Sequence, residues 1–128
     1  IQGLPNQNLN SAMNDIEFLI KNYKVPHLSI YLLTLEPKSS LFKKFHNQYS
    51  SMEYNELTSE MFIKTHQYLN NQYNHYEISN FHRKDLMNPS IHNSNYWKGD
   101  SFIGFGMSAF SKMNNLYYKN PLSLKEYF

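Results

Sequence analysis

The sequence predicts an α/β fold in which amphipathic helices alternate with short apolar strands. Two segments with helical spacing of apolar residues, roughly 9–23 and 53–72, flank the nearly continuous apolar run 28–33. Another apolar run, 102–106, ends in glycine. Such alternation is typical of parallel βα units. We therefore expect a portion of a partial (β/α) barrel rather than a self-contained fold.

The first helix is expected over roughly 9–23. Its apolar side chains recur every three or four residues: Leu9, Met13, Ile16, Ile20 and Tyr23. Asn8 is the expected N-cap, because its side-chain oxygen can accept an otherwise unpaired amide proton of the first turn. Pro26 prevents the helix from continuing.

The run 28–33 lies between two prolines, and its length and composition predict a strand buried on both faces, as in a parallel sheet. A short helix is expected over 39–45. The second long helix, roughly 53–72, has its own apolar stripe: Tyr54, Leu57, Met61, Thr65 and Tyr68.

The remaining part of the chain is less regular. Residues 75–79 have a β-like composition, whereas 80–100 contains Asn, Pro, Gly and Asp and is expected to be an irregular functional loop. The tail, 121–128, is expected to be helical and to begin near Pro121 or Ser123.

Composition excludes several classes of function. The chain has 128 residues, a net charge of +2 and no long basic run, so we expect no nucleic-acid partner. It has no cysteine, which excludes disulfides, thiolate zinc sites and an iron–sulfur site built from these residues. No apolar run approaches the ~20 residues of a membrane span, and no signal peptide is evident. A cytoplasmic location is the default expectation; an organelle and the oligomeric state stay open.

No metal site is predicted. Three of the six histidines are too widely spaced to form a zinc site: His75, His82 and His92. The other three are expected at the surface: His27, His46 and His66.

Four ordered motifs cover nearly the whole chain. The first is Gly3-Leu4-Pro5-x-Gln7, and the second is the segment 26–37. The third has two parts, Tyr76-Glu77-Ile78-Ser79-Asn80-Phe81 and His92-Asn93-x-Asn95-Tyr96-Trp97. The fourth is Gly104-x-Gly106-x-Ser108-Ala109. Together they resemble the HemW-type heme chaperones and the oxygen-independent coproporphyrinogen III oxidases, which are radical S-adenosylmethionine proteins. The first motif alone is weak evidence, but the ordered set is specific.

The resemblance implies a barrel of the radical S-adenosylmethionine type, with 1–74 as its last βα units and 75–128 as a family-specific segment. It implies S-adenosylmethionine and a [4Fe–4S] cluster in the full-length form, with heme or porphyrinogen as the partner. The three cluster cysteines are absent, so we expect a later portion of the family's sequence or a degenerate relative. The implied function is heme delivery or coproporphyrinogen oxidation. The alternative is a cluster-free heme- or tetrapyrrole-binding module without catalysis, and no catalytic residue is assigned.

Heme or substrate contact is expected from His92, Asn93, Tyr96 and Trp97. A neutral imidazole can ligate heme iron, and aromatic side chains offer flat faces to a macrocycle. The alternative is a loop held by side-chain hydrogen bonds, in which Trp97 packs as an anchor.

Cofactor contact is expected from Thr34, Leu35, Gly104 and Gly106. The first two follow a predicted barrel strand, where barrel enzymes place their sites; otherwise they are core residues. The segment around Gly104 and Gly106 is not expected to be a dinucleotide-binding loop, because it has no third glycine and no helix start. The two glycines indicate close backbone approach, either to a neighbouring segment or to the cofactor.

Two positions depart from the family pattern. Asn6 stands where many relatives have glycine, and Phe110 stands where HemW-type members usually have histidine. If that histidine takes part in heme handling in the family, this chain lacks it.

The first testable prediction follows from the absence of cysteine. Iron–sulfur clusters are normally held by thiolates, so this chain by itself should incorporate no cluster and cleave no S-adenosylmethionine. Anaerobic reconstitution followed by iron and sulfide analysis checks this, and stoichiometric cluster incorporation would contradict it.

Overall fold

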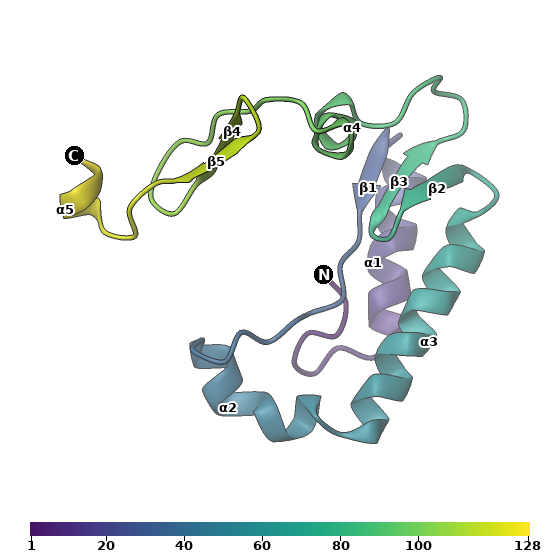
Figure 1. Ribbon diagram of the computed structural model, residues 1–128. Coiled ribbons are helices and arrows are strands. Elements are labelled where there is room, and N and C mark those ends of the chain that lie inside the picture. Colours follow the sequence, from purple (N-terminus) through teal and green to yellow (C-terminus); the bar gives the residue numbers. More distant parts are fainter. The chain divides into compact units, whose positions relative to one another are not determined.

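Three helices and a three-stranded sheet make up residues 1–89 of the computed structural model, which describes all of residues 1–128. In chain order this first unit contains α1 (Leu9–Asn22), β1 (His27–Ser29), α2 (Ser40–Tyr49), α3 (Met52–Leu69), β2 (Tyr73–Glu77) and β3 (Asn80–Arg83). The second unit, 90–128, contains α4 (Ile91–Lys98), β4 (Phe110–Met113), β5 (Leu116–Lys119) and α5 (Leu124–Tyr127) (Figure 1).

The predicted helices of the first unit are confirmed, and each begins at a side-chain cap. Asn8 Oδ1 accepts the Ser11 amide at 2.9 Å, while Ser11 Oγ accepts the Asn8 amide at 3.0 Å, which is a reciprocal capping box. Ser39 caps α2 and Ser51 caps α3 with a single bond each: the serine side chain accepts an amide proton of the first turn. The predicted 53–72 helix ends earlier, at Leu69.

A tight turn precedes α1. The Gln7 amide donates to the Leu4 carbonyl at 3.0 Å, and the Gln7 side-chain oxygen accepts the Gly3 amide at 2.7 Å. Asn6 has φ 63°, the left-handed conformation that a type II turn requires after Pro5. Asparagine tolerates this conformation better than most residues, which explains how it replaces glycine here.

The turn is attached to α3 by two side chains. The buried Gln2 donates its Nε2 to Thr65 Oγ1 at 2.7 Å, and the Tyr54 hydroxyl donates to the Gly3 carbonyl at 3.3 Å. Burial, with a smaller contribution from Tyr49, raises the pKa of Tyr54 to about 12. The phenol therefore remains a hydrogen-bond donor at any physiological pH.

The strands of the first unit pair antiparallel, in the order β1-β3-β2. The prediction of a parallel sheet is therefore wrong for these strands. For β2 and β3 the physical reason is the connection: only two residues join them, and so short a link can build a hairpin but no parallel crossover. Parallel pairing occurs only at the bridge between Gln2 and Leu32. The mixed helix–sheet architecture agrees with an α/β class, and the partial barrel stays a proposal.

The predicted strand 28–33 is only partly confirmed. β1 ends at Ser29, and the side chains of Tyr31 and Leu32 are 49% and 40% exposed. Their backbone is held by Gln2 alone, whose amide donates to the Tyr31 carbonyl at 2.8 Å. Because β1 pairs with one strand only and lies at the edge of the sheet, this segment is not a buried central strand.

The core of the first unit lies between the sheet and the two long helices, α1 and α3, which pack side by side (Figure 1). Its buried side chains come from all these elements: Ile16, Leu28, Leu69, Tyr73 and Phe81. The Tyr73 hydroxyl donates to the Val25 carbonyl at 2.8 Å, so its polar end is satisfied inside the core.

The second unit differs most from the prediction. The expected loop 80–100 contains β3 and α4, and the expected strand 102–106 is irregular apart from a bridge between Phe102 and Lys112. The strands there are instead β4 and β5, joined by Asn114 and Asn115 at φ 50° and 64°. Positive φ at both central residues is the type I′ turn that favours hairpins. The expected C-terminal helix is confirmed as the short α5.

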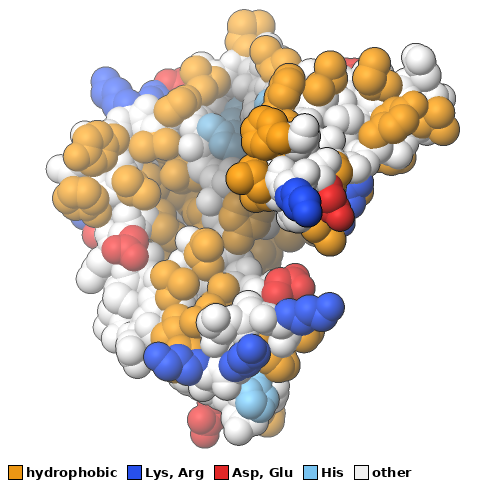
Figure 2. Space-filling view, turned by 90° about the vertical axis from the view of Figure 1, so that its left-hand side faces the viewer, with side chains coloured by type: hydrophobic (Ala, Val, Ile, Leu, Met, Phe, Trp, Pro, Cys, Tyr) orange, Lys and Arg blue, Asp and Glu red, His pale blue; other side chains and the backbone are white.

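Hydrophobic side chains remain at the surface in both units, and Figure 2 shows many of them on the face turned to the viewer, interspersed with charged side chains. No helix combines the length and apolar character needed to cross a membrane. The predicted division at residue 74 concerns family architecture and stays a prediction; the two units meet in sequence at Pro89 and Ser90.

Replacement of Leu69 by alanine tests the core. Leu69 is 1% exposed, so Leu69→Ala should lower the free energy of unfolding by about 2–5 kcal/mol. Ile63 lies on the same helix and is 52% exposed, so Ile63→Ala should change it by no more than about 0.5 kcal/mol. Chemical denaturation of both variants measures the difference, and equal losses would contradict this core.

Candidate functional site

The histidine–asparagine–tyrosine–tryptophan motif lies on α4, not on a loop. Ser90 Oγ accepts the Asn93 amide at 3.3 Å and begins the helix. Gly99, at φ 75°, ends it: its amide bonds the Tyr96 carbonyl, and the Asp100 amide bonds the Asn95 carbonyl at 3.0 Å. This pair of bonds is a Schellman motif. The caps thus convert a segment rich in turn formers into two turns of helix.

The helix places His92 and Tyr96 one turn apart on the same face. Their ring centroids are 4.9 Å apart with the planes at 88°, an edge-to-face contact. Tyr96 in turn meets Phe102 at 4.7 Å. Three rings from α4 and the following segment therefore form a continuous row.

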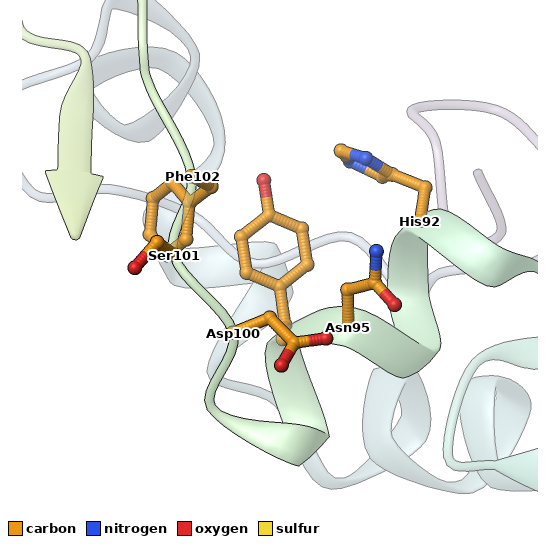
Figure 3. Close-up of a pocket in the computed structure, with 6 residues that line it drawn as sticks. His92, Asn95, Asp100, Ser101 and Phe102 are labelled. Carbon is orange, nitrogen blue, oxygen red and sulfur yellow. The ribbon is translucent and has the colours of Figure 1, made fainter. Parts of the chain in front are cut away.

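A small cavity lies along this row of rings. Its volume is about 60 Å³, and six residues line it: His92, Asn95, Tyr96, Asp100, Ser101 and Phe102. Figure 3 shows the His92 and Phe102 side chains on opposite sides of the opening, with Asp100 and Asn95 at its lower edge. A pocket that encloses a drug-sized ligand has roughly 300–1,000 Å³. This cavity can therefore hold water or one small polar group, but it cannot enclose a macrocycle.

His92 is exposed, and neither of its ring nitrogens makes a hydrogen bond within the protein. Its ring makes an edge contact with Tyr96. Asn93 is half-buried, and Trp97 is 75% exposed. An imidazole in this environment has a lone pair available for a metal ion or a proton donor.

Gly104 and Gly106 lie in a loop whose backbone is held by other residues of the second unit. The Gly104 amide donates to Ser111 Oγ and the Gly106 amide to the Tyr127 hydroxyl, each at 3.0 Å. The Asn120 side chain donates to both glycine carbonyls, at 3.2 and 2.9 Å. These bonds fix the course of the loop.

The need for glycine differs between the two positions. A Cβ at Gly104 would lie 2.1 Å from the Phe110 carbonyl oxygen, whereas one at Gly106 would meet nothing within 4 Å. Gly106 instead has φ 92°. The close approach expected for this motif therefore occurs at Gly104, toward a neighbouring strand.

The other two candidates, Thr34 and Leu35, belong to the first unit. They follow the Gln2–Leu32 bridge in a segment without regular structure before α2, where Thr34 is exposed and Leu35 half-buried. The sequence missed the cavity-lining roles of Asn95, Asp100 and Ser101. The helical spacing of Asn95 from His92 would have indicated one of them if α4 had been recognised.

The remaining histidines lie in the first unit. His27, expected at the surface, is half-buried, and its Nε2 lies 2.6 Å from the Tyr76 hydroxyl. Burial lowers the pKa of His27; Glu77 opposes this shift and His82 adds to it. No group of three His, Cys, Asp or Glu side chains is placed to bind a metal ion.

Comparison with known proteins decides the family. Heme chaperone HemW of Buchnera aphidicola subsp. Schizaphis graminum is 33% identical over 115 residues, which are 89% of this chain and 29% of the relative. Heme chaperone HemW of Lactococcus lactis is 29% identical over 94% of this chain and 31% of its own length. Radical S-adenosyl methionine domain-containing protein 1, mitochondrial, of Danio rerio is 34% identical over 83% of this chain and 23% of its own length.

The chain belongs to the HemW-type family. It spans less than one-third of each of these relatives' length, between 23% and 31%. No family model and no solved structure matches it.

Membership in the HemW-type family implies S-adenosylmethionine and a [4Fe–4S] cluster, but these residues do not fit a cluster. Thiolates normally hold such clusters, and the chain has no cysteine. Phe110 lies on β4 with 52% of its surface exposed. The Lys119 Nζ lies 5.2 Å from its ring centroid.

Substitutions at the two glycines test the geometry of the loop. Gly104→Ala should displace β4, because the new Cβ meets a backbone carbonyl that cannot rotate away. Gly106→Asn should leave β4 in place, because the surrounding space is open and its cost is confined to backbone strain at φ 92°, which asparagine bears better than most residues. Amide NMR spectra of residues 110–119 report the displacement, and matching spectra for Gly104→Ala and the wild type would contradict the close contact.

Proposed function

We propose that this chain is a heme-binding part of a HemW-type protein and that His92 supplies an axial ligand to heme iron. One observation carries the proposal: in the family motif, an exposed imidazole on a capped helix has both nitrogens without a hydrogen-bond partner in the protein. A neutral imidazole nitrogen is a common axial ligand of heme.

Tyr96 gives this imidazole a defined orientation. The edge contact at 4.9 Å restricts rotation of the His92 ring, so less conformational entropy is lost when iron binds. Since the neighbouring cavity measures only about 60 Å³, the macrocycle would lie outside it. Exposed apolar side chains on the same helix, Ile91 and Trp97, are both 75% exposed and suit a flat apolar ligand.

The chemistry of the ligand favours heme delivery over coproporphyrinogen oxidation. An imidazole lone pair can coordinate the iron of heme, whereas a porphyrinogen contains no metal ion to coordinate. The names of the HemW relatives agree with a chaperone role for those proteins.

Contact of Thr34 and Leu35 with the adenosine of S-adenosylmethionine belongs to the same proposal, as does a cytoplasmic location. The presence of glycine at positions 104 and 106 is already explained by the close approach to Phe110 and by the positive φ. Their assignment to the cofactor is weaker for that reason.

The cluster-free alternative makes the same use of His92. A tetrapyrrole-binding module without catalysis needs the imidazole and the apolar surface but neither S-adenosylmethionine nor a cluster. The absence of cysteine from these residues is compatible with that reading. Heme binding by this chain alone would therefore support the ligand assignment in either version.

Heme titration followed by absorbance tests the proposal. The wild-type chain should give a saturable spectrum with the signature of an imidazole-ligated iron. His92→Ala should lose that signature, and its affinity should fall by at least about tenfold, since loss of about 1.4 kcal/mol already has this effect. Added free imidazole should restore the spectrum of the variant.

His46→Ala is the matched control, because His46 is also exposed and lies on a helix of the first unit. It should bind heme as the wild type does. Identical spectra and affinities for His92→Ala and the wild type would remove His92 from the site. Circular dichroism of both variants separates loss of a ligand from loss of the fold.

A further inference from the structure

The imidazoles of His66, on α3, and His75, on β2, lie against each other in the first unit. Their Nε2 atoms are 3.2 Å apart, and the ring planes are nearly perpendicular, at 86°. We infer that this pair forms a chelating site for a late first-row divalent metal ion such as Zn²⁺ or Cu²⁺. The site is separate from the proposed heme ligand and does not depend on it.

The tautomer of His66 suits a metal ligand. Its Nδ1 lies 2.8 Å from the Phe62 carbonyl oxygen, which can only accept a hydrogen bond. The proton therefore resides on Nδ1, and the Nε2 lone pair is directed toward His75. Metal-binding histidines commonly donate their second nitrogen to a backbone carbonyl in this way, which fixes the ring and raises its basicity.

The separation of the two nitrogens fits one shared ion. With metal–nitrogen bonds of about 2.0–2.1 Å, a 3.2 Å gap between the Nε2 atoms corresponds to a ligand–metal–ligand angle of roughly 100°, close to tetrahedral. A cavity of about 310 Å³ adjoins both rings, so water can complete the coordination shell. His75 is exposed and His66 half-buried, which gives an ion access from solvent.

Phe81 holds both rings in place from the core side. It is 2% exposed, and its ring lies 5.0 Å from that of His66 and 4.7 Å from that of His75. Because Phe81 and the two strands are fixed by the core, the chelate is preorganised, and little side-chain entropy is lost on binding.

Metal binding requires one tautomeric change. His75 Nε2 also lies 3.1 Å from the Ile78 carbonyl oxygen, so in the metal-free protein it carries the proton. When the ion binds, this proton moves through solvent to Nδ1, and His75 Nε2 gives up its hydrogen bonds to the Ile78 carbonyl and to His66 Nε2. No net proton is released from two neutral imidazoles.

The donor set selects the class of metal. Two imidazole nitrogens without a carboxylate suit zinc, copper or nickel and disfavour Mg²⁺ and Ca²⁺, which prefer oxygen ligands. The order of affinity should follow Cu²⁺ above Zn²⁺.

Isothermal titration of the tag-free chain with Zn²⁺ tests the inference. The wild type should bind one ion in this site, and His66→Gln and His75→Gln should each weaken binding by at least about tenfold. His46→Gln is the matched control: His46 Nδ1 also faces the carbonyl four residues earlier, at 3.1 Å, and its ring also stacks on phenylalanine, but it has no imidazole partner. This variant should bind as the wild type does.

Thermal unfolding gives a second readout. Zn²⁺ should raise the unfolding temperature of the wild type and of His46→Gln but not that of the two site variants, because an ion that binds only the folded state stabilises it. Equal zinc affinity in all four proteins would overturn the site. His92→Ala should leave the zinc titration unchanged, so failure of the heme proposal and failure of this one can be told apart.

Discussion

Phe81 occupies the position on which the first unit depends. Its backbone pairs with Leu28 on one side and His75 on the other, so it lies on the central strand of the sheet. A slip of one residue in either register would turn its ring away from Ile16 and Leu69 and toward solvent. The same ring supports His66 and His75. Core packing, strand register and the histidine pair are thus set by a single buried side chain.

Where local periodicity was strong, the sequence was sufficient to predict the helices. The stripes through Ile16 and Met61 predicted α1 and α3, and Asn8 was recognised as a cap. The direction of strand pairing was not accessible in this way, because it depends on the two-residue link between β2 and β3. The helix α4 was missed since its apolar residues follow no regular stripe; its signals are the caps Ser90 and Gly99.

Two of the residues that line the cavity, His92 and Tyr96, were among the predicted site residues, but the cavity itself was not predicted. The sequence identified His92 and Tyr96 but placed them on a loop, so their one-turn spacing carried no meaning. The apolar run ending at Gly106 looked like a strand, yet Phe105 is 84% exposed, because the neighbouring hairpin uses residues from Phe110 onward. The pair His66–His75 was beyond sequence reasoning, since a helix and a strand bring the two rings together.

The second unit has no buried side chain at all. Its order rests on hairpin hydrogen bonds, caps and the Asn120 clamp, so local opening costs little free energy, and its amide protons should exchange with solvent well before those of α3. A ligand that binds there must also restrict this motion, and part of its intrinsic affinity offsets the lost chain entropy. A site in this unit would therefore release its ligand more readily than the same contacts on a rigid, well-packed support.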